Sequence, residues 1–227
     1  MIRLVAPKNI VMTPLIRVII HHPNLMRSKV FLQAMKIFPQ KLSGSYDARM
    51  RANQSEYQEL LVQGMALIDT LPKTIIDIGT GTGIAAFAAA KVFPEAYILG
   101  IDHSDGMIAH AMEKLDQANT GRISFTQGNA CDLLYDDQSF DLVVSSNAPI
   151  YLDEATRVLK FGGHLMVAFS FAFTAFTRVE ADIMNMLKPY GVELLHLKGQ
   201  GKGVVIIGKK HDASPAWETK TEDPCGG

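Results

Sequence analysis

Short apolar runs alternate with helical patterns from Thr74 onward, and this alternation constrains the fold of the 227-residue chain more than any other feature. Most of these runs are nearly continuous, as expected for strands that are covered on both faces. Strands joined by helices form right-handed parallel units, and ligands bind beyond the carboxyl ends of such strands. The pattern therefore predicts an α/β fold built on one open, doubly wound sheet. The expected strands cover residues 74–79, 97–102, 123–128, 140–146 and 164–170, and the expected helices cover residues 84–92, 106–115 and 178–187.

The last two apolar runs, VELLHLK at 192–198 and VVIIGKK at 204–210, break this alternation. Only the short segment GQGKG separates them. A parallel pair needs a crossover of about a dozen residues or more, whereas a short glycine-rich link makes a hairpin. We therefore expect a mostly parallel seven-stranded sheet that ends with one antiparallel strand.

The first 72 residues form a predicted helical cap in front of the sheet. Residues 24–38 and 46–71 show helical spacing, and the second segment places Tyr57, Leu60, Leu61, Met65 and Ile68 on one stripe. Such a cap either covers the sheet or closes over a substrate as a lid. We divide the chain into a cap or lid at 1–72, a ligand-binding domain at 73–210 and a polar, flexible tail at 211–227.

The composition excludes several classes of function. With 48% hydrophobic and 20% charged residues and a formal net charge of -1, the chain resembles an ordinary soluble protein, and we expect no nucleic-acid partner. Its two cysteines are too few for a disulfide framework, and no cluster of ligand residues has the spacing of a metal site. We therefore expect no metal and a reducing, cytoplasmic location.

One uncharged apolar stretch, residues 161–177, resembles a membrane span. It is at the short limit for a spanning helix, and two glycines, a histidine and several hydroxyl side chains interrupt it. We expect a buried strand with its exit loop here, and no membrane span. The N-terminus also lacks the apolar core of a signal peptide.

The sequence IIDIGTGTG at 75–83 joins the first strand to its helix through three glycines. Free backbone N–H groups and the positive end of a helix dipole meet at such a turn, which favours binding of a ligand. A dinucleotide motif would need its third glycine at Ile84, but here it comes one residue earlier, at Gly83. A tight turn without any ligand is the alternative.

Asp102 ends the second strand about twenty residues after the glycines, where a carboxylate commonly accepts both hydroxyls of a ribose. Ser104 follows as a predicted N-cap of the next helix. The alternative for Asp102 is a role in capping that helix.

In their order along the chain, these segments resemble the class I S-adenosylmethionine-dependent methyltransferases, in particular the small-molecule branch that includes quinone-type methyltransferases. The resemblance covers residues 73–210, includes the reversed last strand and implies a Rossmann-like methyltransferase fold. The segments that carry it are DIGTGTG, GIDHSDGMI, GNACDL and FDLVVSSNAPIYLDEATRVLKFGGHLMVAFS.

The resemblance implies S-adenosylmethionine as the cofactor and a role for each matching residue. Asp77 would hold the methionine amino group, the glycine turn would lie against the cofactor, and Asp102 would bind the ribose. Asn129, which stands where many members have Asp, would read the adenine edge together with the backbone of Ala130. The implied cofactor site comprises Asp77, Gly79, Thr80, Gly81, Gly83, Asp102, His103, Met107, Asn129, Ala130 and Asn147.

The implied reaction is an in-line displacement of the methyl group onto a small-molecule acceptor, and it requires no metal. Asn147, Pro149 and Tyr151 are similar to the N-P-P-Y motif of amino-group methyltransferases, although Tyr151 is displaced by one residue. We therefore prefer to interpret this segment as a loop that lines the methionine end of the cofactor. The candidate catalytic residues are Tyr46, Asn147 and Tyr151, and Asp47 is a more distant candidate base.

Four phenylalanines near the end of the fifth strand either belong to the core or line an acceptor pocket. The second interpretation predicts an apolar or aromatic acceptor. Two other functions are alternatives to this one: a non-catalytic cofactor-binding protein with the same fold, and an amine-directed N-methyltransferase. The phenylalanines are Phe169, Phe171, Phe173 and Phe176.

Overall fold

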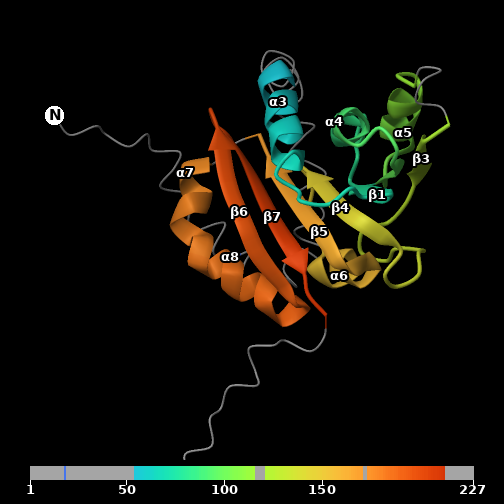
Figure 1. Ribbon diagram of the computed structural model, residues 1–227. Coiled ribbons are helices and arrows are strands. Elements are labelled where there is room, and N and C mark those ends of the chain that lie inside the picture. Colours follow the sequence, from blue (N-terminus) through green and yellow to red (C-terminus); the bar gives the residue numbers. More distant parts are fainter. Residues whose placement is uncertain (1–17, 19–53, 116–120, 171–172, 213–227) are drawn as a thin grey trace, which may run out of the picture.

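The computed structural model describes residue 18 and residues 54–115, 121–170 and 173–212. Seven strands form one sheet in the order β3-β2-β1-β4-β5-β7-β6 (Figure 1). All the strands predicted from the apolar runs are present, which confirms the α/β fold class. Their bounds are β1 (Thr74–Ile78), β2 (Tyr97–Asp102), β3 (Ile123–Gln127), β4 (Phe140–Ser146), β5 (Leu159–Phe169), β6 (Val192–Gln200) and β7 (Gly203–Lys210).

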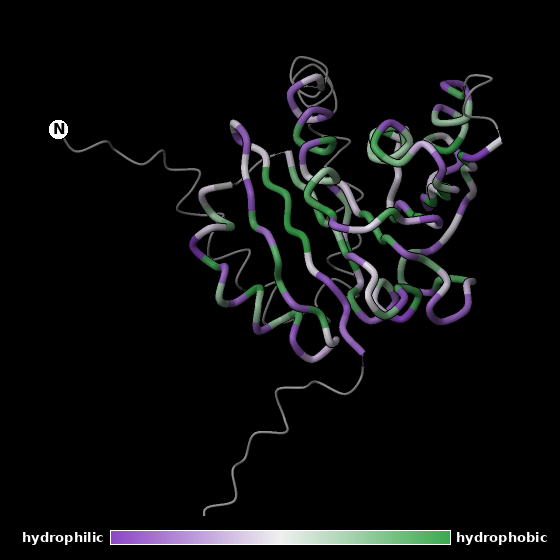
Figure 2. Tube along the Cα trace, in the orientation of Figure 1, coloured by the Kyte–Doolittle hydropathy of each residue, from purple (hydrophilic) through white to green (hydrophobic). Residues whose placement is uncertain are grey.

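The last strand of the chain is the reversed one, as predicted. β7 pairs antiparallel with both β5 and β6, so it lies between them and does not form the edge of the sheet. The predicted antiparallel last strand is therefore confirmed, and β6 is the edge strand beside it. The run Val204–Ile207 is buried throughout and appears as a continuous apolar stretch in Figure 2, whereas β6 carries exposed polar side chains that suit an edge.

Helices cover both faces of the sheet and enclose two apolar clusters. One cluster contains side chains from the first three described helices, and the other contains side chains from the later ones, so each face has its own helical layer (Figure 1). The first layer consists of α3 (Gln54–Met65), α4 (Ile84–Val92) and α5 (Asp105–Met112). The second consists of α6 (Leu152–Val158), α7 (Phe173–Phe176) and α8 (Glu180–Leu187), with 3₁₀ turns at η2 (Thr177–Val179) and η3 (Lys188–Tyr190).

Several element bounds differ from the predicted ones. Helix α3 ends at Met65 instead of Leu71, and α5 ends at Met112 instead of Leu115, because the backbone after each switches to i→i−3 hydrogen bonds. The helix expected at 178–187 is divided into η2 and α8. β5 begins five residues early, at Leu159, because Leu159 pairs with Phe140 across a bulge. The expected helix at 24–38 and the tail beyond residue 212 lie outside the described residues.

Helix α3 packs directly on the sheet, against β5, β6 and β7. Every residue of its predicted apolar stripe is buried. A Cβ atom on Gly64 would lie 2.9 Å from Val205 Cγ1 and 3.0 Å from Met166 Cε, so this glycine allows a close approach between helix and strands. Near its start, the Tyr57 hydroxyl forms a buried hydrogen bond of 2.8 Å with Ser146 Oγ, at the carboxyl end of β4.

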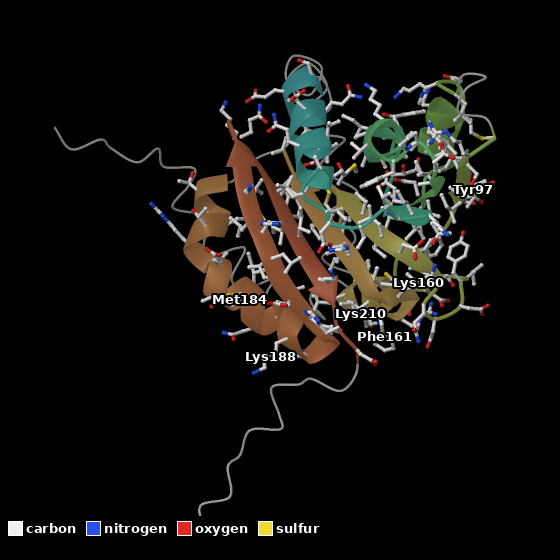
Figure 3. All side chains as sticks on the ribbon, viewed as in Figure 1. Tyr97, Lys160, Phe161, Met184, Lys188 and Lys210 are labelled. Carbon is white, nitrogen blue, oxygen red and sulfur yellow. The ribbon has the colours of Figure 1, made fainter. Side chains whose placement is uncertain are left out.

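A second set of contacts fixes the last residue of β7, Lys210, at the end of the strand away from Val205. The Lys210 ammonium donates to the carbonyl oxygens of Thr156 and Leu159 at 2.7 and 2.8 Å, and it lies 4.6 Å from the centre of the Phe161 ring (Figure 3). The reversed strand is thereby attached to the junction between α6 and β5.

Candidate functional site

The turn after β1 has a backbone that only glycine adopts readily. Gly79, Gly81 and Gly83 have φ angles of 72°, 54° and 86°, all in the left-handed region. Gly83 is the N-cap of α4, so the helix begins immediately after the third glycine. The chain therefore turns from the buried strand into the helix at the carboxyl edge of the sheet.

The three glycines differ in what surrounds the missing side chain. A Cβ atom on Gly79 would collide with Ala148, and one on Gly83 would lie 2.9 Å from the Phe125 ring. At Gly81, no atom of the described residues other than Gly81 and its two chain neighbours lies within 4 Å of the corresponding position. Two of the glycines thus serve internal packing, whereas Gly81 leaves open space in which a ligand can lie against the backbone.

Asp77 is buried beneath this turn, with 1% of its surface exposed. Its Oδ2 accepts hydrogen bonds from the Thr80 hydroxyl at 2.7 Å and from the Ala86 N–H at 3.1 Å. Its Oδ1 is buried and has no hydrogen-bond partner among the described residues. Burial, opposed by these two hydrogen bonds, raises the pKa of Asp77 to about 6. A buried carboxylate with one unpartnered oxygen suits a cationic ligand group.

Asp102 joins the glycine turn to the start of α5. Its Oδ2 accepts from the Gly81 N–H at 2.9 Å, its Oδ1 accepts from the Ser104 N–H at 2.9 Å, and His103 Nδ1 lies 3.3 Å from Oδ1. Ser104 caps α5 by accepting from the Met107 N–H, as predicted, so helix capping does not account for Asp102. Each carboxylate oxygen can accept a further hydrogen bond from a ligand hydroxyl.

The segment after β3 continues this edge. The Gly128 N–H donates to the Asp102 carbonyl oxygen at 2.9 Å, which places Asn129 and Ala130 next to the acid that would bind a ribose. Asn129 Oδ1 accepts from the Cys131 N–H at 3.1 Å and so shapes a tight turn. Backbone and carboxylate contacts therefore connect the carboxyl ends of three neighbouring strands.

Asn147 holds the carboxyl ends of β4 and β5 together. It adopts a left-handed backbone with φ 54°, and its Oδ1 accepts from the Ser170 N–H at 2.9 Å and from Ser170 Oγ at 3.2 Å. Its own N–H donates to the Ala168 carbonyl oxygen at 2.9 Å. Tyr151 is 6% exposed at the start of α6. These contacts favour the interpretation as a loop that closes the edge of the sheet. They argue against an amine site of the N-P-P-Y type.

Two pairs of interacting side chains lie at or near this edge, and the sequence alone assigned a role to neither pair. One is the pair Tyr57 and Ser146, and the other is the pair Glu154 and Arg157, which binds the connection between β3 and β4. The i,i+3 spacing of Glu154 and Arg157 on α6 was visible in the sequence. The Tyr57 contact was not, because 89 residues separate the two partners.

The other predicted residues are the remaining catalytic candidates and the phenylalanines near the end of β5. Tyr46, Asp47 and Phe171 lie outside the described residues. Phe169 and Phe176 stack with ring centres 5.0 Å apart at the end of β5, and Phe176 is 8% exposed. Both rings belong to or pack against the apolar cluster of the second face. The cofactor roles of the other site residues stay predictions.

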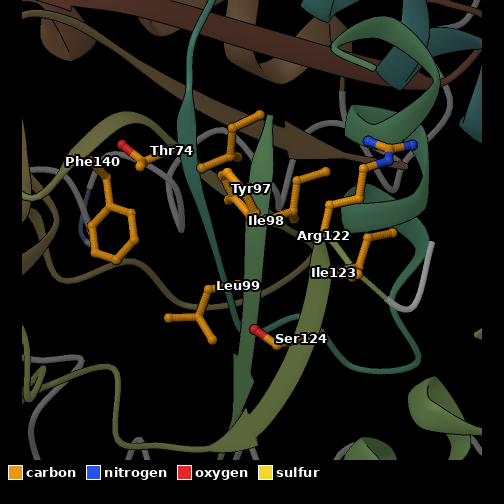
Figure 4. Close-up of a pocket in the computed structure, with 10 residues that line it drawn as sticks. Thr74, Tyr97, Ile98, Leu99, Arg122, Ile123, Ser124 and Phe140 are labelled. Carbon is orange, nitrogen blue, oxygen red and sulfur yellow. The ribbon is translucent and has the colours of Figure 1, made fainter. Parts of the chain in front are cut away.

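A separate cavity of about 200 Å³ lies on the strands at the other edge of the sheet (Figure 4). Its lining comes largely from the amino-terminal halves of β1, β2 and β3, away from the glycine turn. This cavity is therefore not part of the candidate site, which rests on the glycine turn and its contacts. The lining residues are Thr74, Ile75, Tyr97, Ile98, Leu99, Gly121, Arg122, Ile123, Ser124 and Phe140.

None of the described helices has the length and apolar character needed to cross a membrane. The described part of the chain contains no group of three His, Cys, Asp or Glu residues arranged to hold a metal ion.

The model of a protein family described as a methyltransferase domain matches residues 72–200, more than half of the chain. The chain therefore belongs to this family of methyltransferase enzymes, which confirms the class I methyltransferase resemblance and the enzyme class predicted from the sequence. The chain is also 33% identical over 143 residues to a demethylmenaquinone methyltransferase of Listeria welshimeri, an alignment that covers 57% of this chain and 59% of the relative. The match thus spans about three fifths of the length of that relative.

Solved structures agree on the fold. A chain from the complex between the Haloferax volcanii Trm112 methyltransferase activator and a methyltransferase superposes with a TM-score of 0.61 at 18% identity, covering 75% of this chain and 97% of that chain. A SAM-dependent methyltransferase from Aquifex aeolicus superposes with a TM-score of 0.51 at 16% identity, covering 65% and 88%. These similarities confirm the Rossmann-like methyltransferase fold.

Proposed function

We propose that this chain binds S-adenosylmethionine at the carboxyl edge of the sheet and transfers its methyl group to a small apolar or aromatic acceptor. The observation that carries the cofactor assignment is the combination of two features of the glycine turn. Asp77 presents a buried carboxylate oxygen without a partner among the described residues, and Gly81 leaves open space above the backbone. The first fits a cationic ammonium and the second fits a ligand that lies flat on the turn.

The residues along the edge supply a complementary group for each part of this cofactor. Asp77 would hold the amino group, Asp102 would accept hydrogen bonds from the ribose hydroxyls, and Asn129 with Ala130 would contact the adenine edge. When bound, the cofactor supplies an electrophilic methyl group on a sulfonium. The contribution of the protein is then to align the acceptor and to exclude water, an effect worth up to about 7–11 kcal/mol.

The acceptor assignment has two supports. The first is the similarity to demethylmenaquinone methyltransferases, whose name indicates a quinone, demethylmenaquinone, as their substrate. The second is Phe169 at the end of β5, whose partly buried ring stacks on the buried Phe176 and whose chain neighbour Ser170 contacts Asn147. Planar aromatic acceptors stack well on such rings.

The N-terminal residues 1–72 would act as a lid in this proposal. Helix α3 starts at the carboxyl edge, because Tyr57 binds Ser146 and a Cβ atom on Gly203 of β7 would touch Leu60. The first turns of α3, where the described part of the chain resumes, therefore lie at the same edge as the proposed cofactor site. A cytoplasmic location is part of the same proposal, supported by the presence of only two cysteines.

A turnover assay tests the proposal. The chain is incubated with S-adenosylmethionine and one member each of the hydroquinones, phenols, amines and thiols, and formation of S-adenosylhomocysteine is measured together with methylated product. We expect turnover with the hydroquinone or the phenol. Product from the amine alone would instead support the amine-directed alternative, against which the hydrogen bonds of the Asn147 side chain argue.

Titration calorimetry separates the remaining alternatives. Binding of S-adenosylmethionine without turnover of any acceptor would support a non-catalytic cofactor-binding protein. Failure to bind either S-adenosylmethionine or S-adenosylhomocysteine would overturn the proposal. NAD serves as the control ligand, and we expect no binding because the third glycine of a dinucleotide motif is displaced.

A further inference from the structure

The connection between β3 and β4, residues 128–139, contains no helix or long strand, although it joins two parallel strands across the sheet. A long irregular connection has backbone groups that must find partners outside a helix, and it stays in one place only if other elements hold it. Its first residues are Gly128, Asn129 and Ala130, which lie beside Asp102. The position of this candidate adenine segment therefore depends on what holds the connection.

Arg157 and Glu154 on α6 hold it. The Arg157 guanidinium donates from Nη2 to the Leu133 carbonyl oxygen at 2.9 Å and from Nη1 to the Tyr135 carbonyl oxygen at 2.8 Å. Nη1 also donates to the Asp137 carboxylate at 2.9 Å. Its Nε and Nη2 form a bidentate pair with Glu154 at 2.8 Å each, and Glu154 Oε2 accepts from the Leu133 N–H at 2.7 Å.

The planar guanidinium presents five N–H donors in a fixed geometry, and all five donate in this arrangement. Lysine at the same position would keep the charge but would lack the fork that reaches two carbonyl oxygens and a carboxylate together. Glu154 is 17% exposed and Arg157 is 30% exposed, whereas the Asp137 side chain is 71% exposed. The bonds to Leu133 and Glu154 are therefore better shielded from solvent than the one to Asp137.

We propose that Arg157 and Glu154 are positioning residues for adenine recognition, which they control by holding the connection so that Asn129 and Ala130 face the adenine edge. This inference rests on the proposed cofactor. Neither side chain contacts the cofactor in this assignment. Their effect is therefore on which base the site accepts and on cofactor affinity, and not on the methyl-transfer step.

The test compares two ligands that differ only at the base. S-adenosylhomocysteine carries the 6-amino group, and S-inosylhomocysteine carries an oxygen there, so the ratio of their affinities measures adenine recognition alone. We expect the unmodified chain to prefer the adenine ligand at least tenfold, because a site that hydrogen-bonds a polar group rejects the analogue without it. Arg157→Lys should weaken the adenine ligand about tenfold and change the inosine ligand less than twofold. Its kcat at saturating cofactor should stay within twofold of the unmodified value.

Two further variants keep the result interpretable. Asp137→Asn is the matched control, because it removes the charge of a solvent-exposed partner of the same guanidinium, and its affinity ratio should be unchanged. Glu154→Gln keeps an oxygen for the Leu133 N–H but removes the charge, so its affinity ratio should be lower than that of the unmodified chain. It replaces Arg157→Lys in the test if that variant fails to fold. An unchanged ratio in folded Arg157→Lys or Glu154→Gln would overturn the inference. Absence of S-adenosylhomocysteine binding by the unmodified chain would instead overturn the proposed function, and the inference with it.

Discussion

Replacement of Asp77 by asparagine should stabilise the ligand-free fold and weaken the cofactor at the same time. The carboxylate is 1% exposed, and burial raises its pKa from 3.8 to about 6. The folded chain therefore holds this proton more tightly than the unfolded chain does. Between about pH 4 and pH 6 unfolding releases the proton, so the free energy of unfolding falls as the pH rises through this window.

The size of the effect follows from the shift of about two pKa units, each worth about 1.4 kcal/mol. Above pH 7 the ionised carboxylate costs the fold about 3 kcal/mol relative to a neutral group of the same shape. Asparagine is such a group, and its oxygen can still accept from Thr80 and Ala86. We expect Asp77→Asn to gain about 2–3 kcal/mol at pH 8, or about 4–12 °C in Tm for a chain of this size.

Chemical denaturation of both chains at pH 8 and at pH 4.5 measures this difference. The gain should be largest at pH 8 and should fall to about a third of that value at pH 4.5, where the folded chain holds the proton but most unfolded chains do not. Asp136→Asn is the control, because it removes an exposed acid and should show no such pH dependence. A stability difference that is the same at both pH values, or a loss of stability at pH 8, would refute the assignment of a buried, charged Asp77.

Cofactor binding by the same pair of chains gives the complementary result. The affinity of the unmodified chain for S-adenosylhomocysteine should rise as the pH increases through about 6, because the ammonium requires the ionised carboxylate. Asp77→Asn should bind at least tenfold more weakly at pH 8 and should lack this pH dependence. Equal affinities would show that the amino group is held elsewhere.

Three further substitutions test other parts of the fold and site. Gly81→Ala should cost about 1 kcal/mol of stability through backbone strain but lower cofactor affinity at least tenfold. Gly83→Ala should cost more stability, because its Cβ also meets aromatic rings. Equal losses of stability in denaturation and equal losses of affinity in calorimetry for the two variants would contradict this. Asp102→Ala should weaken S-adenosylhomocysteine binding more than tenfold in a chain that still folds, and unchanged affinity would refute the ribose assignment. Gly64→Ala should lower the free energy of unfolding by about 1–3 kcal/mol, because its Cβ would press on Val205, despite the better helix propensity of alanine; a more stable variant would refute this packing.

Much of the fold follows from local patterns in the sequence. The period of the apolar residues predicted every strand and the stripe of α3, and the short glycine-rich link predicted the antiparallel hairpin. Helix ends were less predictable, because the switch to i→i−3 bonds after Met65 and Met112 depends on how the last turn meets the sheet. The edge position of β6 depends on which strand can pair on both sides, and hydrophobic spacing along the chain does not decide that.

The candidate site divides in the same way. The sequence by itself determined the strand, the glycine turn and Asp102, because a strand, a turn and a helix of this composition place these groups at one edge whatever surrounds them. Only the tertiary structure decided that Asp77 has an oxygen without a partner among the described residues, that Gly81 is the one glycine of the turn that faces open space, and that Arg157 holds the connection after Asn129. These features arise from contacts between residues distant in the sequence, and burial and hydrogen-bond geometry decide such contacts only when the whole sheet has assembled.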